Sequence, residues 1–390
     1  MLPTTPPVDL REAAPMGGQG PSAGGGAPAL RDLLAAAVAH GASDLHLRAD
    51  SAPLVRISGQ LVPLDLPVLT GGQVEAMVLA ALHSARDRQA FTEHREADFA
   101  VSEPGVGRFR SNAYWTRGRA AMVLRHVKEV VPTLDELGMP SAVRALTEGS
   151  SGLVLVCGPT GSGKTTTLAA MVGAINAERR CHILTIEDPI EFLHADRLAT
   201  ISQRELHTDT LDFASALRAG LRQDPDVILV GEIRDLATMR TALQAAETGH
   251  LVLASLHARS VVDAVNRVID VFPVEEQRQA RTTIAEAVRG VICQHLVPAA
   301  DGQGRRLVME IAVATPRVRE AILDPERTGT LEDIVAEGEY YGMRTFAQDA
   351  VRLVLSGAIT ARAAEAVVPR AADLHVALRR KGYRDPEAGG

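Results

Sequence analysis

The amino-acid sequence predicts an α/β protein with a small α+β domain followed by a larger domain built on a parallel sheet. The chain has 390 residues, too many for one ordinary hydrophobic core, and this length favours roughly two to three domains. The apolar pattern changes near residue 132, from mixed helices and hairpins to short apolar strands alternating with helices. A glycine-rich turn connects the first of these strands to a helix.

Residues 1–28 differ in composition from the rest of the chain, because 12 of them are proline or glycine. Such a segment buries too little apolar surface to offset its loss of conformational entropy, so we predict a disordered tail. Residues 29–132 are predicted to form the α+β domain. Its expected elements are helices over 30–38 and 74–82, a strand over 44–47, a hairpin over 54–62, and strands over 107–113 and 120–127.

Residues 133–370 are predicted to form the second domain. Four short apolar runs are expected to be buried parallel strands, covered by helices on both faces. They are Gly152–Cys157, His182–Ile186, Val227–Val230 and Leu251–Ser255. From about residue 275 the pattern predicts a helical C-terminal part, and residues 371–390 are expected to be a charged tail.

Composition excludes several classes of protein. Aromatic residues are 3% of the chain, the formal charge is −7 and the arginines are scattered, which disfavours nucleic-acid binding. The cysteines Cys157, Cys181 and Cys293 lie far apart, so neither a disulfide framework nor a zinc site is expected. No secretory signal and no apolar run long enough to span a membrane is visible. We therefore expect a soluble cytoplasmic protein.

The glycine-rich turn matches the pattern G-x-x-x-x-G-K-[ST], in which backbone N–H groups and a helix N-terminus cradle phosphate. We expect Lys164 to reach the β- and γ-phosphates of a nucleoside triphosphate and Thr165 to bind Mg²⁺. The predicted ATP-binding residues are Gly158, Pro159, Thr160, Gly161, Ser162, Gly163, Lys164, Thr165 and Thr166.

Acidic residues follow two of the predicted strands. Glu232 comes just after Val227–Val230, and Glu187, Asp188 and Glu191 follow His182–Ile186. Open α/β sheets bind ligands at the carboxyl ends of their strands, and crowded acids favour a shared cation. These acids are therefore candidates for metal binding and catalysis, with solvated loop residues as the alternative.

Two histidines flank the fourth strand, His250 before it and His257 after it. Either could sense the γ-phosphate or a neighbouring subunit, and a structural role is equally compatible with the sequence. In the first domain, Arg110 and Arg125 could approach a phosphate from outside the phosphate-binding domain. Surface solvation is the simpler interpretation of Arg108 and Arg119.

With these residues in view, the chain resembles the PilT-type pilus retraction ATPases of the type II/IV secretion ATPase superfamily, over roughly residues 29–380. The matching segments are Ala42–His46, the acidic Asp box Thr185–Phe192, the atypical Walker B segment Asp226–Glu232, which has Gly231 where other ATPases carry Asp, and the His box Thr248–His257.

The resemblance implies a PAS-like N-terminal domain joined to a RecA-like ATPase domain in a homohexameric ring. It makes Glu191 and Glu232 the catalytic carboxylates, which position water and Mg²⁺, with Glu187 and Asp188 beside them. It brings Arg110 and Arg125 to the phosphates and lets His250 and His257 couple nucleotide state to domain motion. The implied partner is an inner-membrane pilus platform protein, which places the motor at the inner face of the cytoplasmic membrane.

The expected function is ATP-driven retraction of a type IV pilus. No further N-terminal domain and no four-cysteine zinc motif is expected, and both absences favour the retraction branch. The segment Thr315–Leu323 departs from the retraction signature, so pilus extension or a type II secretion-like assembly ATPase stays an alternative. A RecA-like nucleic-acid motor and a catalytically idle nucleotide switch are the more distant ones.

Overall fold

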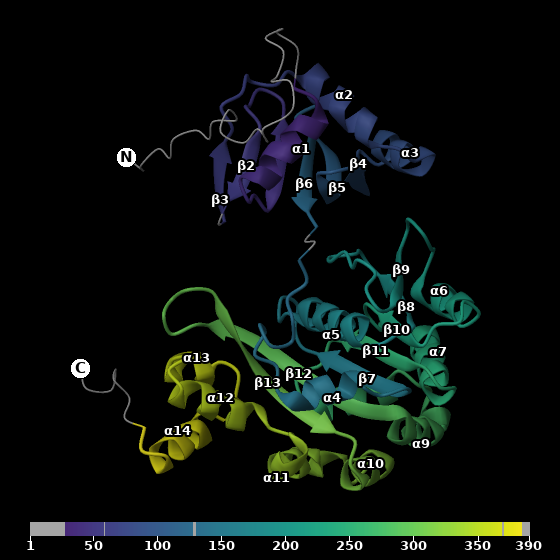
Figure 1. Ribbon diagram of the computed structural model, residues 1–390, viewed down its shortest axis with the longest axis vertical. Helices are drawn as coiled ribbons and strands as arrows, with labels where there is room; N and C mark the ends of the chain where they lie inside the picture. Colours follow the sequence, from purple (N-terminus) through teal and green to yellow (C-terminus); the bar gives the residue numbers. More distant parts are fainter. Residues whose placement is uncertain (1–27, 58, 128–129, 369, 384–390) are drawn as a thin grey trace. The chain divides into compact units, whose positions relative to one another are not determined.

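The computed structural model describes residues 28–57, 59–127, 130–368 and 370–383. They divide into two compact units, one before residue 130 and one from residue 130 onward, and each unit has its own sheet (Figure 1). The tail predicted to be disordered lies outside the described residues, apart from Pro28.

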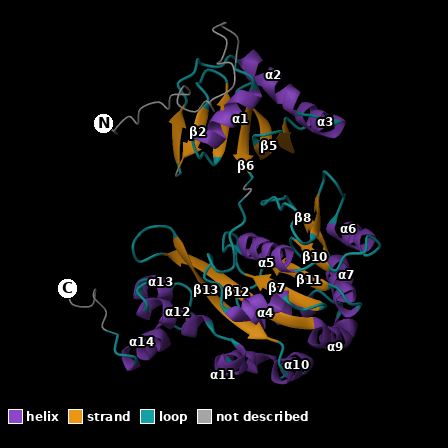
Figure 2. Cartoon of the chain, in the orientation of Figure 1, coloured by secondary structure: helices purple, strands orange, loops and turns teal. Residues whose placement is uncertain are grey.

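The N-terminal unit is a six-stranded antiparallel sheet with strand order β3-β2-β1-β6-β5-β4, packed against three helices (Figure 2). Its strands are β1 (Asp44–Arg48), β2 (Leu54–Ile57), β3 (Gln60–Pro63), β4 (Glu96–Glu103), β5 (Gly107–Thr116) and β6 (Arg119–His126). Its helices are α1 (Leu30–Ala39), α2 (Gly71–Ala81) and α3 (Ala85–Glu93).

One hydrophobic core joins all three helices to one face of this sheet. Because side chains alternate along a strand, Leu45 on β1, Phe109 on β5 and Leu124 on β6 point into the core. Arg110 and Arg125 therefore belong to the opposite face, where they are directly paired across β5 and β6.

Two elements of this unit, α3 and β4, were not predicted. Helix α3 has a single buried residue, Phe91, and so lacks an apolar stripe; its clearest signal is Ser84, whose side chain accepts the N–H of Asp87. Strand β4 buries only Ala97 and Val101. Both elements are held by neighbours distant in sequence rather than by a strong local pattern.

The second unit contains a seven-stranded sheet of order β13-β12-β7-β11-β10-β8-β9, parallel except for β13. Its strands are β7 (Gly152–Cys157), β8 (His182–Glu187), β9 (Thr200–Glu205), β10 (Val227–Val230), β11 (Leu251–Leu256), β12 (Val288–Pro298) and β13 (Arg305–Val313). The four predicted strands are confirmed as β7, β8, β10 and β11.

Helices cover both faces of this sheet, as predicted. Helices α4 (Ser141–Thr147) and α5 (Lys164–Glu178) pack on one face. The opposite face carries a larger core shared by the remaining helices. They are α6 (Phe213–Gly220), α7 (Leu236–Glu247), α8 (Val261–Asp270), α9 (Gln277–Ala287), α10 (Pro316–Leu323), α11 (Leu331–Glu337), α12 (Phe346–Leu355), α13 (Ala361–Glu365) and α14 (Ala371–Arg380).

The C-terminal part is helical from Pro316 onward, but the prediction of helix from about residue 275 is wrong for the hairpin β12–β13. Most of β12 is buried, including the polar Gln294, so its sequence lacks the apolar–polar alternation of a half-exposed strand. Residues 371–380, expected as a charged tail, form α14, which buries Leu374 and Leu378 against the core.

The segment Thr315–Leu323 is well formed as a helix. The Thr315 side chain accepts the N–H of Val318, and Pro316 occupies the first turn of α10, where its missing N–H costs nothing. None of the helices among the described residues is long and apolar enough to cross a membrane.

Candidate nucleotide-binding and catalytic site

The phosphate-binding segment connects the end of β7 to the start of α5. Gly161 and Gly163 have positive φ angles of 78° and 90°, which favour glycine. A Cβ on Gly158 would lie 2.5 Å from both the Gln294 carbonyl oxygen and Ser162 Oγ. No side chain caps the N-terminus of α5, so the first-turn N–H groups are available to an anion.

A buried glutamine supports this segment from β12. Gln294 Nε2 donates to the Ser162 carbonyl at 2.8 Å, and Gln294 Oε1 accepts from Thr167 Oγ1 at 3.0 Å. Gln294 is fully buried, so both bonds are shielded from water and hold the glycine turn against the start of α5. The sequence analysis missed this residue, which lies 132 positions after Ser162 and has no local signal.

Lys164 bends back over the glycine turn. Its Nζ donates to the carbonyls of Gly158 at 2.9 Å and Pro159 at 3.1 Å. Burial lowers the pKa of Lys164, and the nearby carboxylates Glu232 and Glu191 oppose that shift. Neutral carbonyls are weaker partners for an ammonium group than phosphate oxygens are, so the side chain is placed to bind an anion in the turn.

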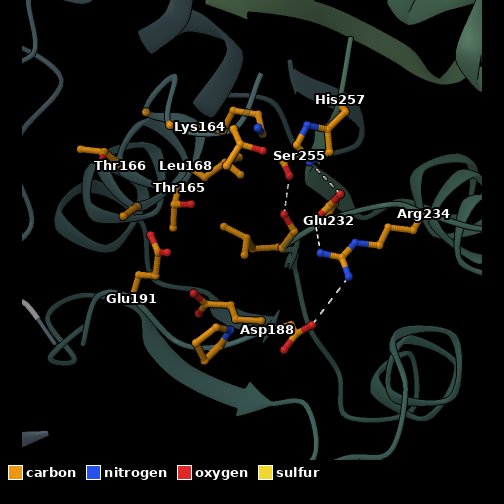
Figure 3. A pocket seen from close by; sticks show the side chains of 18 of the residues that line it. Lys164, Thr165, Thr166, Leu168, Asp188, Glu191, Glu232, Arg234, Ser255 and His257 are labelled. Carbon is orange, nitrogen blue, oxygen red and sulfur yellow. Dashed lines mark hydrogen bonds and ion pairs between the residues drawn. The ribbon is translucent and has the colours of Figure 1, made fainter. Parts of the chain in front are cut away.

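A cavity of 480 Å³ opens beside the glycine turn. Residues near the carboxyl ends of four parallel strands, β8, β10, β11 and β12, line it. Figure 3 shows its side chains. From the predicted site it is lined by Thr160, Gly161, Gly163, Lys164, Thr165, Thr166, Glu187, Asp188, Glu191, Glu232 and His257. The structure therefore brings together the phosphate-binding turn, both acidic segments and one of the two histidines.

Glu232 lies between Arg234 and His257 (Figure 3). Its Oε1 is 3.0 Å from His257 Nε2, and its Oε2 accepts from Arg234 Nη2 at 2.6 Å. Burial alone would raise the pKa of Glu232, but the hydrogen bond from Arg234 and the charges of Arg234, His257 and Lys164 outweigh burial and lower it. Glu232 is therefore held ionised and in a defined orientation.

Arg234 also lines the cavity, and the sequence analysis missed it. Besides Glu232, its guanidinium lies 3.9 Å from Asp188 Oδ2, so it links the acids that follow β8 and β10. The hydrogen bond to Glu232 raises the pKa of Arg234 further. Its position two residues after Glu232 was the only available signal, because the spatial pairing with Asp188 depends on the order of the strands.

Close packing explains why glycine occupies position 231 in the atypical Walker B segment. A Cβ on Gly231 would lie 3.1 Å from the Ile186 carbonyl oxygen and 3.2 Å from Glu187 Cα. The Ser255 hydroxyl also donates to the Gly231 carbonyl. The ends of β8, β10 and β11 thus approach too closely for a side chain at this position, and the carboxylate is supplied by the next residue, Glu232.

The acids after β8 have different environments. Glu187 is buried and accepts hydrogen bonds from Thr185 Oγ1 at 2.7 Å and Gln203 Nε2 at 3.0 Å. Burial raises its pKa despite these bonds, and the charges of Glu191 and Glu205 add to the shift. Glu191 is exposed to the cavity, and among the described residues it makes no hydrogen bond or ion pair, so its carboxylate is available to a ligand.

His194 also lines the cavity and was not predicted. Burial lowers its pKa to about 4, so the imidazole is neutral at pH 7 and adds no positive charge beside the carboxylates.

His250 does not reach this cavity. It precedes β11, whereas His257 follows it, so the two histidines lie at opposite edges of the sheet, about 20 Å apart for a six-residue strand. His250 Nδ1 lies 3.0 Å from the Ala245 carbonyl oxygen, which places it at the C-terminal end of α7. Within one chain, only His257 joins the phosphate-binding turn.

Arg110 and Arg125 belong to the N-terminal unit. Arg125 Nε donates to Asp44 Oδ1 at 2.8 Å, and Asp44 is buried. Burial raises the pKa of Asp44, but hydrogen bonds from Ser43 and Arg125 outweigh it and lower the pKa. The ionised Asp44 thus fixes one edge of the Arg125 guanidinium on the face opposite to the core.

The donor set suits Mg²⁺. Among the residues with a described position, no group of three or more His, Cys, Asp or Glu side chains is arranged to hold a metal. Mg²⁺ is typically held by one or two protein oxygens together with substrate phosphates and water. Thr165 at the start of α5 and the ionised Glu232, both lining the cavity, fit that requirement.

Comparison with known proteins agrees with this geometry. The family model described as "Type II/IV secretion system protein" matches residues 26–368. The chain is 44% identical over 331 residues to the type IV pilus retraction ATPase PilT of Pseudomonas aeruginosa, covering 85% of this chain and 95% of the relative. It is 43% identical over 312 residues to a twitching motility protein of Neisseria gonorrhoeae, covering 80% and 83%.

Solved structures are similar as well. A crystal structure of the pilus retraction motor PilT with bound ADP matches with a TM-score of 0.83 and 38% identity, covering 90% of this chain and all of that one. The ATPase DotB of Legionella pneumophila matches with a TM-score of 0.76 and 26% identity, covering 86% and 94%.

The protein is therefore a P-loop ATPase with an N-terminal α+β unit. The chain belongs to the type II/IV secretion system protein family, and the predicted resemblance to PilT-type ATPases is confirmed.

Proposed function

We propose that the chain is a Mg²⁺-dependent ATPase that assembles as a homohexamer and powers retraction of a type IV pilus. One observation carries the proposal: Lys164, Glu191, Glu232 and His257 line a single cavity in a chain that covers 95% of the length of a pilus retraction ATPase. An inner-membrane platform protein would be the partner that receives the motion, at the inner face of the cytoplasmic membrane.

The phosphate end of ATP would lie in the glycine turn. Backbone N–H groups of residues 160–166 and Lys164 Nζ would bind the β- and γ-phosphate oxygens. Thr165 and Glu232 would hold Mg²⁺, which neutralises charge on those oxygens when bound. Glu191, whose carboxylate faces the cavity and is bonded to none of the described residues, would orient the water that attacks the γ-phosphorus.

The pair His257–Glu232 offers a link between the nucleotide and the rest of the chain. His257 contacts Glu232 at 3.0 Å and stands in the loop that leads into α8. Loss of the γ-phosphate would therefore change the contact between Glu232 and His257 and could shift the loop that carries His257. Arg110 and Arg125 as phosphate-binding arginines, and His250 as a coupling residue, stay proposals, because none of the three is among the residues that line this cavity.

Pilus extension or a type II secretion-like assembly ATPase is the second candidate. The chain is also 33% identical to the type II secretion system protein HxcR of Pseudomonas aeruginosa, covering 86% of this chain and 76% of that relative. The departure of Thr315–Leu323 from the retraction signature supports the same alternative.

The test is pilus number and twitching in a host strain deleted for the gene and complemented with wild type or Lys164→Ala. Retraction predicts hyperpiliated, non-motile cells that only the wild type restores, because Lys164→Ala removes the ammonium that binds phosphate. Bald cells would establish extension instead. An unchanged pilus phenotype would refute both.

A further inference from the structure

Strand β9 lines no part of the nucleotide cavity, yet its side chains hold the loop that carries Glu191. The strand is parallel to β8 at the edge of the sheet. Gln203 and Glu205 are two residues apart and so lie on the same face of β9. Both are bonded to the segment 187–194, which leads away from the end of β8.

Gln203 makes three hydrogen bonds to this segment with one side chain. Its Nε2 donates to Glu187 Oε1 and to the Phe192 carbonyl, each at 3.0 Å. Its Oε1 accepts the backbone N–H of His194 at 2.9 Å. Both N–H groups of the amide are used, so the side chain has a single orientation in which all three bonds form.

Glu205 bonds the backbone on the N-terminal side of Glu191. Its Oε2 accepts the backbone N–H of Ile190 at 3.0 Å, and its Oε1 accepts from Thr208 Oγ1 at 3.2 Å. Glu205 is buried. Gln203 and Glu205 therefore bond the backbone on both sides of Glu191, at residue 190 and at residues 192 and 194.

The segment 188–194 needs this support because it contains no helix and no strand. Ile190 and Phe192 are buried, so their backbone polar groups must find partners inside the protein. Those partners come from β9. The side chain of the exposed Glu191 between them makes no hydrogen bond or ion pair with any residue that the structure describes, and its direction is set by the backbone on either side.

We propose that Gln203 and Glu205 are positioning residues that aim the Glu191 carboxylate at the nucleotide. This inference rests on the proposed role of Glu191 in orienting the attacking water. A misplacement of about 1 Å in a reacting group costs on the order of 100-fold in rate. Loss of the Gln203 bonds should therefore slow turnover while nucleotide binding is retained.

The first test is steady-state ATP hydrolysis by the full chain carrying Gln203→Met, which keeps the length of the side chain and removes all three hydrogen bonds. We expect kcat to fall about 10- to 100-fold, with KM for ATP and Kd for ADP within twofold of wild type. KM for ATP and Kd for ADP should be unchanged in Gln203→Met because Gln294 on β12, and not β9, supports the glycine turn. A parallel loss of ADP binding would overturn the proposal, as would an unchanged kcat.

A double-mutant cycle separates positioning from a general structural role. Gln203→Met in a Glu191→Gln background should cause no further loss of kcat, because its effect passes through Glu191. A further loss of the same size would overturn the proposal. If the single variant Glu191→Gln hydrolyses ATP at the wild-type rate, the proposed role of Glu191 is wrong and the inference is wrong with it. If Glu191→Gln is impaired but Gln203→Met is fully active, the inference fails and the proposed role of Glu191 stands.

Two further variants control for folding. Ser202→Ala, on the opposite face of β9, removes the contact with His182 Nε2 at 2.9 Å and should leave kcat within twofold. Glu205→Gln keeps an oxygen for the Ile190 N–H and should retain most activity, whereas Glu205→Leu should lose it. If Gln203→Met does not fold, Gln203→Glu serves in its place, since it retains the acceptor for His194 and loses both donors. Full activity of Gln203→Glu and Glu205→Leu would overturn the proposal.

Discussion

Polar residues have opposite uses at the carboxyl ends and at the amino ends of the parallel strands of the seven-stranded sheet, which are called the carboxyl edge and the amino edge below. At the carboxyl edge, Lys164, Glu191, Glu232 and His257 face one cavity. At the amino edge, polar side chains are bonded to the backbone: Asp226 Oδ2 accepts the N–H of His182 at 2.8 Å, and His250 lies against the Ala245 carbonyl.

This difference follows from the topology of the sheet. In a parallel sheet the carboxyl ends of all strands lie at one edge, where the chain leaves toward the helices and ligands bind. Side chains at that edge meet across strands that are far apart in sequence. The amino edge is where loops return to the sheet, and there the same residue types end helices and start strands. Position relative to the strand therefore indicates function better than residue type does.

The largest expected effect at the carboxyl edge, beyond the loss of Lys164, is that of Glu232→Gln. The amide keeps the shape but loses the charge that pairs with Arg234 and that, in the proposed site, would help to hold Mg²⁺. We expect ATP turnover to fall about 100- to 1,000-fold, the range for a lost acid–base or charge-stabilising group. Binding of a fluorescent ATP analogue should persist, because the glycine turn is intact. Turnover within threefold of wild type would remove Glu232 from the catalytic site.

The two histidines give a matched comparison of the edges. His257→Gln removes the ring that contacts Glu232 Oε1 and should lower kcat about 10-fold, in line with the loss of one hydrogen bond to a charged group. His250→Gln, at the amino edge, should change the kcat of the same preparation by less than twofold. A larger loss for His250→Gln than for His257→Gln would mean that His250 acts at the nucleotide of another chain.

The smallest effect concerns a buried acid behind the carboxyl edge. Glu310 Oε2 on β13 accepts the N–H of Val261 at 2.7 Å, at the start of α8. Burial raises its pKa to about 7; the bond from Val261 opposes this shift and the charge of Glu332 adds to it. In the unfolded chain its pKa is near 4.5, so between these values the folded state binds the additional proton.

Stability contributed by that proton is therefore present at low pH and is lost as the pH rises toward 7. Glu310→Gln cannot ionise, so the Tm of wild type should fall relative to that of the variant between pH 5 and pH 8. A change of 1 kcal/mol corresponds to roughly 2–4 °C in a unit of this size. Differential scanning fluorimetry of both proteins across this range checks the sign, and a Tm difference that is constant with pH would contradict it.

Much of the fold and site could be predicted from local patterns. The strands β7, β8, β10 and β11 are short apolar runs between helices, and the glycine turn has a fixed spacing. The elements that were missed lack such signals: α3 has one buried residue, and β12 is buried like a core helix. The supporting residues Arg234, Gln203 and Gln294 were missed because their partners lie across strand boundaries.

The sequence by itself determined which residues can bind phosphate and which acids follow the strands, because the backbone requirements of a glycine turn and the apolar content of a buried strand are local. Tertiary structure alone decided which of those residues meet. The strand order placed His257 beside Glu232 and Asp188 beside Arg234, and set β9 beside the Glu191 loop. These contacts arise from packing between segments distant in the chain, which no local pattern encodes.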